Sequence, residues 1–163
     1  MSVERKQALV AAIRAELARE LAAIERAAKD AWEGATHEEN RPEHNKDMRS
    51  TEASYVAIGQ SARARELAED IAKLDAMKLV AWREGAPIDV GALVSIEGQD
   101  ERGNPHSLEV FIVNAGGGAT VGEGAARVRA VSPKAPLGEV LMGASEGEEV
   151  TLGPRRYEVV RVA

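Results

Sequence analysis

The sequence predicts an α+β protein: an N-terminal antiparallel helical hairpin (a coiled coil) followed by a small antiparallel β domain with one short helix. Three observations support this. Residues 3–32 contain no Gly or Pro and are rich in Ala, Glu, Arg and Leu. A second helical run fills residues 50–82, and short apolar runs separated by Gly and Pro fill the rest. The shift at 83–87 predicts two domains, residues 1–83 and 84–163.

The first helix is predicted from an apolar stripe whose members are three or four residues apart. At 1.5 Å per residue the helix would be roughly 45 Å long. Gly34 is typical of a residue that ends a helix. The stripe consists of Val10, Ile13, Leu17, Leu21, Ile24, Ala28 and Ala31.

The second helix is predicted to begin near Ser50, a suitable N-cap, with Glu52 in its first turn, and to continue to about Trp82. Two such stripes can bury each other in one hairpin, so we expect a monomer. The second stripe consists of Ala53, Val56, Gln60, Ala64, Leu67, Ile71, Leu74 and Met77.

The remaining chain predicts strands at 90–97, 108–113, 125–131, 149–152 and 157–162. Pro136 and Gly143 bound a single short helix between the third and fourth of these. Residues 153–156 are predicted as the last hairpin turn, and residues 116–118 as a loose, flexible loop.

Composition excludes several classes of protein. The net charge of −6 argues against coating of DNA or of an anionic membrane. Without cysteine there is no disulfide, thiol nucleophile or cysteine metal site. The first residues are charged rather than apolar, and no run approaches a membrane span. We therefore expect a soluble cytoplasmic protein.

An acidic, helix-breaking segment, residues 37–47, separates the two helical runs and places the hairpin tip near residues 34–50. Carboxylates at a tip are badly placed for a core and well placed for delivery into a partner. The alternative is a solvated loop whose charge favours the N-terminus of the second helix. His37 and His44 flank these acids without the spacing of a metal site.

The C-terminal pattern resembles the bacterial Gre transcript-cleavage factors of RNA polymerase. The matching residues are Ser132-Pro133 and Pro136-Leu137-Gly138, followed by Leu141-Met142-Gly143, Gly147-Glu148-Glu149-Val150 and Tyr157-Glu158-Val159. The likeness covers nearly the whole chain except the tip. It implies an FKBP-like domain that docks on the polymerase, with Ser132, Pro133, Pro136, Leu137 and Gly138 as the partner-binding segment, and a hairpin that enters the secondary channel.

The resemblance also implies the chemistry of the tip. Two carboxylates would hold a second Mg²⁺ in the polymerase active site and orient water for RNA hydrolysis. The protein would then hold no metal by itself, would share Mg²⁺ at Asp47 in the complex, and would be an accessory factor, not an enzyme. RNA and DNA would be met only within the elongation complex.

The tip departs from the family pattern, because Ala35 follows Gly34 where an Asp is expected and the loop is longer. Asp47 is the favoured lead carboxylate, and Glu43 or Glu52 is the second. Glu38 and Glu39 are alternates. Among these acids stand Arg41, Lys46 and Arg49, which offset self-repulsion or contact RNA phosphate or the partner.

Three functions follow in order of preference. The first is a polymerase-binding elongation factor that stimulates cleavage of backtracked RNA. The second is a non-cleaving Gre-like regulator or inhibitor. The third is a coiled-coil adaptor for another partner. Elsewhere, Arg127 and Arg129 are predicted on one strand face, and Arg155-Arg156 in a turn, where they contact solvent, an acidic partner or nucleic acid.

Overall fold

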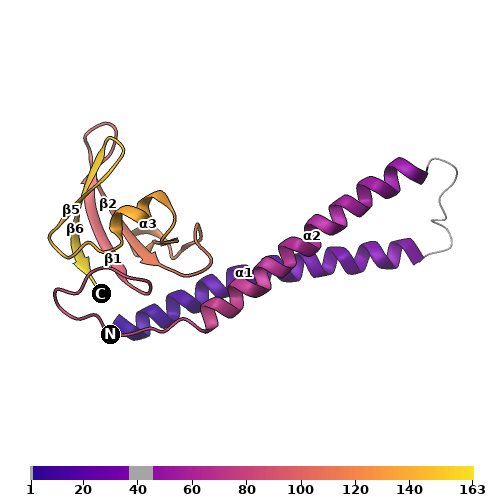
Figure 1. The fold of residues 1–163 in the computed structure, drawn as a ribbon, viewed down its shortest axis with the longest axis horizontal. Coiled ribbons are helices and arrows are strands. Elements are labelled where there is room, and N and C mark those ends of the chain that lie inside the picture. Colours follow the sequence, from indigo (N-terminus) through magenta and orange to yellow (C-terminus); the bar gives the residue numbers. More distant parts are fainter. Residues whose placement is uncertain (1, 37–45) are drawn as a thin grey trace.

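The structure, a computed structural model, describes the backbone of residues 2–36 and 46–163 and the side chains of residues 3–34 and 56–163. Two long helices, α1 (Ser2–Thr36) and α2 (Lys46–Asp75), form a hairpin that extends away from a β-sheet (Figure 1). The α+β class is as predicted. Whether the chain divides into domains at residue 83 stays a prediction.

The predicted helix ends require three corrections. Gly34 lies inside α1, which continues to Thr36, and α2 begins at Lys46, four residues before the predicted cap. The second helix also ends at Asp75, well before Trp82. Asn114 explains part of this early end, because its Nδ2 donates a hydrogen bond of 2.9 Å to the Lys73 carbonyl and so satisfies a group that helix termini leave unpaired.

One six-stranded sheet follows, in the order β3-β4-β2-β1-β6-β5. Its strands are β1 (Leu93–Gln99), β2 (Pro105–Ile112), β3 (Thr120–Val121), β4 (Val128–Val131), β5 (Glu149–Leu152) and β6 (Arg155–Val162). The short helix is α3 (Pro136–Leu141), and a 3₁₀ turn, η2 (Gly124–Ala126), precedes β4.

The sheet is mixed, whereas the sequence predicted an antiparallel one. β2 and β4 pair in parallel, with Glu109 opposite Val128, and the other four pairings are antiparallel. Parallel neighbours need a crossover connection. Here residues 113–127 supply it, including β3 and η2, which the sequence did not predict. The last hairpin turn is also shorter than predicted, because Arg155 and Arg156 already belong to β6.

The sheet carries a hydrophobic cluster on each face. Alternate residues of β1 and β2 face opposite sides, as the pleat requires. Val94, Ile96, Val110 and Ile112 belong to the cluster beneath α3. Their neighbours belong to a second cluster that includes residues of both long helices, consisting of Ile13, Leu17, Leu67, Leu74, Leu93, Phe111, Val113, Ala115, Val121, Val128 and Ala130.

Candidate functional site

The base of the hairpin packs directly on the sheet. Ile13 and Leu67 are fully buried, and they share a cluster with Phe111 of β2. Burial of each such side chain contributes about 1.5–3 kcal/mol of transfer free energy relative to exposure. The hairpin is therefore positioned by the same core that holds the sheet together.

Gly116 makes this contact close. Its φ of +74° lies in the left-handed region, and a Cβ added there would stand 2.7 Å from Ile13 Cγ2. Its neighbour Gly117 is also confined, though less tightly, since a Cβ would lie 3.0 Å from the Ser132 backbone nitrogen. The triple-glycine segment was predicted as a loose loop. In the structure its first two residues are packed between the hairpin base and the chain after β4.

Two polar contacts fix the start of α1. Arg5 Nη2 lies 2.6 Å from Glu109 Oε2 of β2. Lys6 is 1% exposed, and its Nζ donates a hydrogen bond of 3.0 Å to the Val80 carbonyl. Burial lowers the pKa of Lys6, because desolvation disfavours its charged form. Sequence reasoning did not select Lys6, although it continues the apolar stripe four residues before Val10.

Ion pairs join α1 and α2 along the hairpin outside its tip, here called the shaft. Arg14 Nε lies 2.7 Å from Asp75 Oδ1 near the base. Farther out, Arg63 binds Glu20 with both ends of its guanidinium, Nε to Oε1 at 2.8 Å and Nη2 to Oε2 at 3.1 Å. The hydrogen bond from Arg63 is the main reason that the pKa of Glu20 is lowered. Both partners are exposed, so the pair contributes little stability and mainly fixes orientation.

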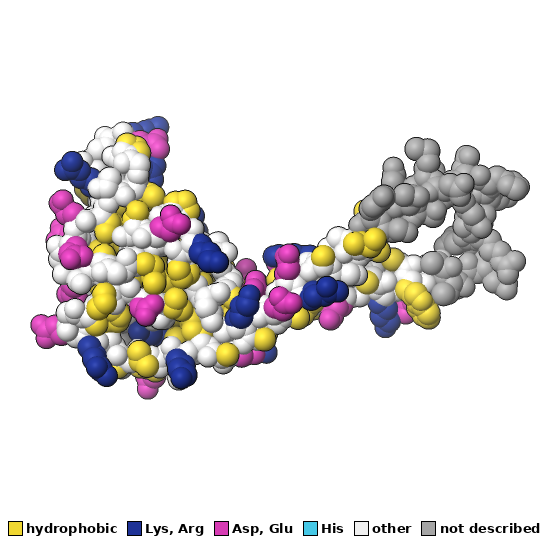
Figure 2. Space-filling view, in the orientation of Figure 1, with side chains coloured by type: hydrophobic (Ala, Val, Ile, Leu, Met, Phe, Trp, Pro, Cys, Tyr) yellow, Lys and Arg dark blue, Asp and Glu magenta, His cyan; other side chains and the backbone are white. Residues whose placement is uncertain are grey.

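The outer part of the hairpin leaves apolar side chains uncovered. Trp32 is 69% exposed, Val56 59% and Ile58 65%. Ala28 and Ala31 of the predicted first stripe are also exposed. α1 and α2 diverge toward the end that is far from the sheet (Figure 1). The predicted seam is thus buried at the base and open farther out, where Figure 2 shows apolar and charged side chains interspersed on the visible face.

The predicted tip residues lie outside the described part of the chain. Glu38, Glu39, Arg41 and Glu43 fall in the segment whose backbone is not described. Lys46, Asp47, Arg49 and Glu52 belong to α2, but their side chains are not described. α1 ends and α2 begins at the same distal end of the hairpin (Figure 1).

The described residues contain no group of three or more His, Asp or Glu residues that could hold a metal ion. Among the helices of that same part, none is long and apolar enough to cross a membrane.

The predicted partner-binding segment forms a tight turn that leads into α3. The Ala135 amide donates a hydrogen bond of 3.0 Å to the Ser132 carbonyl. A Cβ added at Gly138 would overlap that same carbonyl oxygen, so only glycine lets α3 pack this closely. Leu137 and Gly138 are buried, whereas Pro136 is exposed and Pro133 is partly exposed.

This segment lines one wall of a cleft of about 660 Å³, here called the inner groove. Pro136 and Leu137 line it together with Leu108 of β2 and Tyr157 of β6. Arg129 lines both this groove and a second cleft.

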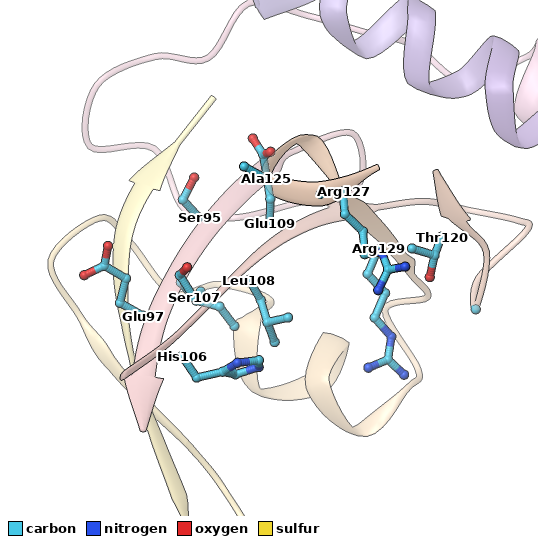
Figure 3. Close-up of a pocket in the computed structure, with 13 residues that line it drawn as sticks. Ser95, Glu97, His106, Ser107, Leu108, Glu109, Thr120, Ala125, Arg127 and Arg129 are labelled. Atoms are coloured by element: carbon cyan, nitrogen blue, oxygen red, sulfur yellow. The ribbon is translucent and has the colours of Figure 1, made fainter. Parts of the chain in front are cut away.

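The second cleft, the edge groove, has a volume of about 830 Å³ and lies beside β2. Figure 3 shows Arg127 and Arg129 across from Ser107 and Leu108. Both arginines line this groove, but only Arg129 lies in β4, whereas Arg127, predicted in the same strand, precedes it. Arg155 instead pairs with Glu101 at 2.7 Å.

Comparison with solved structures finds similar chains among Gre-factor homologues. "GreA factor homolog 1 (Gfh1)" of Thermus thermophilus is 17% identical with a TM-score of 0.36, covering 94% of both chains. A structure titled "transcription factor Gfh1" is 23% identical with a TM-score of 0.36, covering 94% of this chain and 92% of the other. Gfh1 of Thermus aquaticus is 19% identical with a TM-score of 0.32, covering 92% of this chain and 90% of the other.

No protein-family model matches the sequence, and no curated protein matches it. Identities and TM-scores this low leave the function of the chain to be argued from its own residues.

Proposed function

We propose that this protein is a Gre-like accessory factor of RNA polymerase that inserts its hairpin into the secondary channel and stimulates cleavage of backtracked RNA. The observation that carries the proposal is the hairpin itself. Its base shares a core with the sheet, and about 28 Å of α1 extends beyond Leu17, the last buried residue among the described side chains of that helix. Such a shaft presents its tip well away from the rest of the protein.

The distal surface supports insertion into a partner. Trp32, Val56 and Ile58 expose apolar area that the hairpin itself does not cover. Among these, Trp32 is aromatic, and aromatic side chains are enriched at protein interfaces. At the opposite end of the molecule, the inner groove beside Pro136 provides a separate docking surface. Two contact regions at opposite ends suit a protein that is held outside a channel while its hairpin reaches inward.

The tip carboxylates would supply the chemistry. Asp47, with Glu43 or Glu52, offers the hard oxygen ligands that Mg²⁺ prefers. A second Mg²⁺ shared with the polymerase would activate water and stabilise the leaving oxygen of the RNA phosphodiester. The role of this chain is to carry the carboxylates to that point and orient them. It is therefore an accessory factor whose activity depends on the polymerase.

The test is transcript cleavage in a backtracked elongation complex of the cognate polymerase. Wild type is compared with Asp47→Asn, Glu43→Gln and Glu52→Gln at equal occupancy of the polymerase. We expect Asp47→Asn and one of the two Glu variants to lose cleavage by 100-fold or more while still binding, because misplacing or removing an oriented group costs about that much. Matched controls are Glu25→Gln and Glu69→Gln, exposed acids of the shaft.

The outcomes separate the three candidate functions. RNA shortening that requires Asp47 supports the cleavage factor. Stable binding without shortening, together with slower nucleotide addition, identifies the non-cleaving regulator. If the protein binds no polymerase, the proposal fails and an adaptor for another partner takes its place.

A further inference from the structure

We propose that the edge groove binds an extended acidic segment of a partner protein, which adds as a short strand to the free edge of β2. This site is separate from the hairpin and does not depend on the polymerase proposal. Two independent features of the groove support it, an unpaired stretch of strand on one wall and two unpaired arginines on the other.

The first feature is the incomplete pairing of β2. β1 pairs with β2 along its length, from Leu93 opposite Phe111 to Gln99 opposite Pro105. On its other side β2 pairs with β4 only from Glu109 to Ile112. Within the described part of the chain, residues 105–108 therefore have a neighbouring strand on one side only, and an unpaired strand edge is a template for another chain.

Hydrogen-bond alternation shows which groups are available at this edge. The Ile112 amide donates to the Ala92 carbonyl at 3.0 Å, and the Ile112 carbonyl accepts from Gly91 at 2.7 Å. Even-numbered residues of β2 thus bond toward β1, and in an antiparallel pair the alternate residues bond the opposite way. The amide and carbonyl of Ser107 consequently point toward the groove. Pro105 is the next such residue and has no N–H, so any added strand centres on Ser107.

The second feature is the charge of the facing wall. Arg127 has an extended backbone and leads into β4, and Arg129 follows two residues later. Residues two apart on an extended chain point to the same face, about 7 Å apart, which matches alternate acidic residues of a strand. The backbone amide of Arg127 donates a hydrogen bond of 3.3 Å to the Gly124 carbonyl, but among the described residues neither guanidinium has a hydrogen bond or ion pair. Both guanidiniums lie on the side of the groove across from Ser107 (Figure 3).

A peptide fits the groove better than a nucleic acid does. Only a peptide backbone supplies the alternating donor and acceptor that Ser107 requires. Glu97 also lines the β1–β2 side, and its carboxylate would repel a continuous row of phosphates, whereas the Glu109 carboxylate is paired with Arg5. An extended peptide with acids on one face places them against the arginines and turns its other face away.

The probe is an acetylated, amidated seven-residue peptide of alternating glutamate and valine, tested against the whole protein. Affinity is measured by fluorescence anisotropy, and the site by the chemical shift of the Ser107 backbone amide. A lysine–valine peptide tests the charge. A version with N-methylated backbone amides tests strand addition without altering the protein. A single-stranded DNA heptamer tests nucleic acid.

We expect the acidic peptide to bind with a shift at Ser107 and the N-methylated peptide to bind at least tenfold more weakly. The double variant Arg127→Ala/Arg129→Ala should weaken binding about three- to tenfold, as expected for two exposed charge pairs. The control Arg65→Ala, on the hairpin, should not change it.

The proposal is overturned if the acidic peptide does not bind, if N-methylation leaves the affinity unchanged, or if the double arginine variant binds as the wild type does. Binding of the DNA heptamer in preference to the acidic peptide would replace it with a nucleic-acid site.

Discussion

The base and the outer part of the hairpin are built from the same two helices but are stabilised differently. At the base, Ile13, Leu67 and Leu74 are buried against the sheet. In the outer part, Trp32 and Val56 are exposed, and the described contacts between the helices include the Arg63–Glu20 ion pair. The base therefore determines where the hairpin points, while the outer part presents a surface. Substitutions at the base should therefore change stability more than substitutions in the outer part.

The largest contrast is expected between Leu67→Ala and Val56→Ala. Leu67 is fully buried in the cluster that joins hairpin and sheet, so its truncation should lower the free energy of unfolding by about 2–5 kcal/mol. Val56 is 59% exposed, and its truncation should change stability by no more than about 0.5 kcal/mol. Urea unfolding followed by circular dichroism measures both. Equal effects would mean that the seam is buried along its whole length.

The next contrast lies within the triple-glycine segment. Gly116→Ala should cost about 2–3 kcal/mol, since it adds a clash with the buried Ile13 to the strain of a positive φ. Gly118→Ala has a similar positive φ but open space around its Cβ, so only the strain remains. The difference between the two variants in urea unfolding isolates the contact with the hairpin base. A Gly116 variant as stable as the Gly118 variant would contradict close packing there.

In the outer hairpin, replacing glycine by alanine should raise stability instead of lowering it. A Cβ added at Gly59 of α2 meets nothing within 4 Å. Gly59→Ala should therefore stabilise the helix by about 0.5–1 kcal/mol through propensity alone. Helix content in a thermal melt measures this. Destabilisation would reveal a close neighbour of Gly59 that the described contacts do not include.

The smallest effect is expected from the Arg63–Glu20 pair. The lowered pKa of Glu20 means that its stabilising contribution is present above the ordinary pKa of glutamate and is lost as the pH falls through the lowered value. A double-mutant cycle of Glu20→Gln and Arg63→Gln should give a coupling of about 0.2–1 kcal/mol at neutral pH. We expect the coupling to weaken as the pH is lowered toward 2. Persistence of the coupling there would rule out an ionic origin.

The sequence predicted the helices and most strands because those segments have clear periodicity. Residues 149–152 form β5 as predicted, and α3 begins at Pro136 as predicted. The end of α2 was missed because residues 76–82 retain good helix formers. Tertiary contacts override this propensity: Met77 and Leu79 pack on the core at the hairpin base, and Lys6 binds the Val80 carbonyl.

The parallel position of β4 could not be predicted either, since it depends on a crossover whose residues have no strong pattern. For the site, spacing predicted Arg127 and Arg129 on one strand face; both line the edge groove, although Arg127 precedes β4. The free edge beside them depends on where β4 begins, which only pairing reveals. The tip carboxylates remain a prediction from sequence.

Because Gly116 packs against Ile13 near the start of α1, a small change in this contact would be amplified along the helix. Tilting the base by about 5° would move the end of α1 by about 2–3 Å over the 28 Å beyond Leu17. Packing of Gly116 against Ile13 at the near end thus bears on the position of the far end, so a substitution in the loop after β2 can displace residues that are far from it.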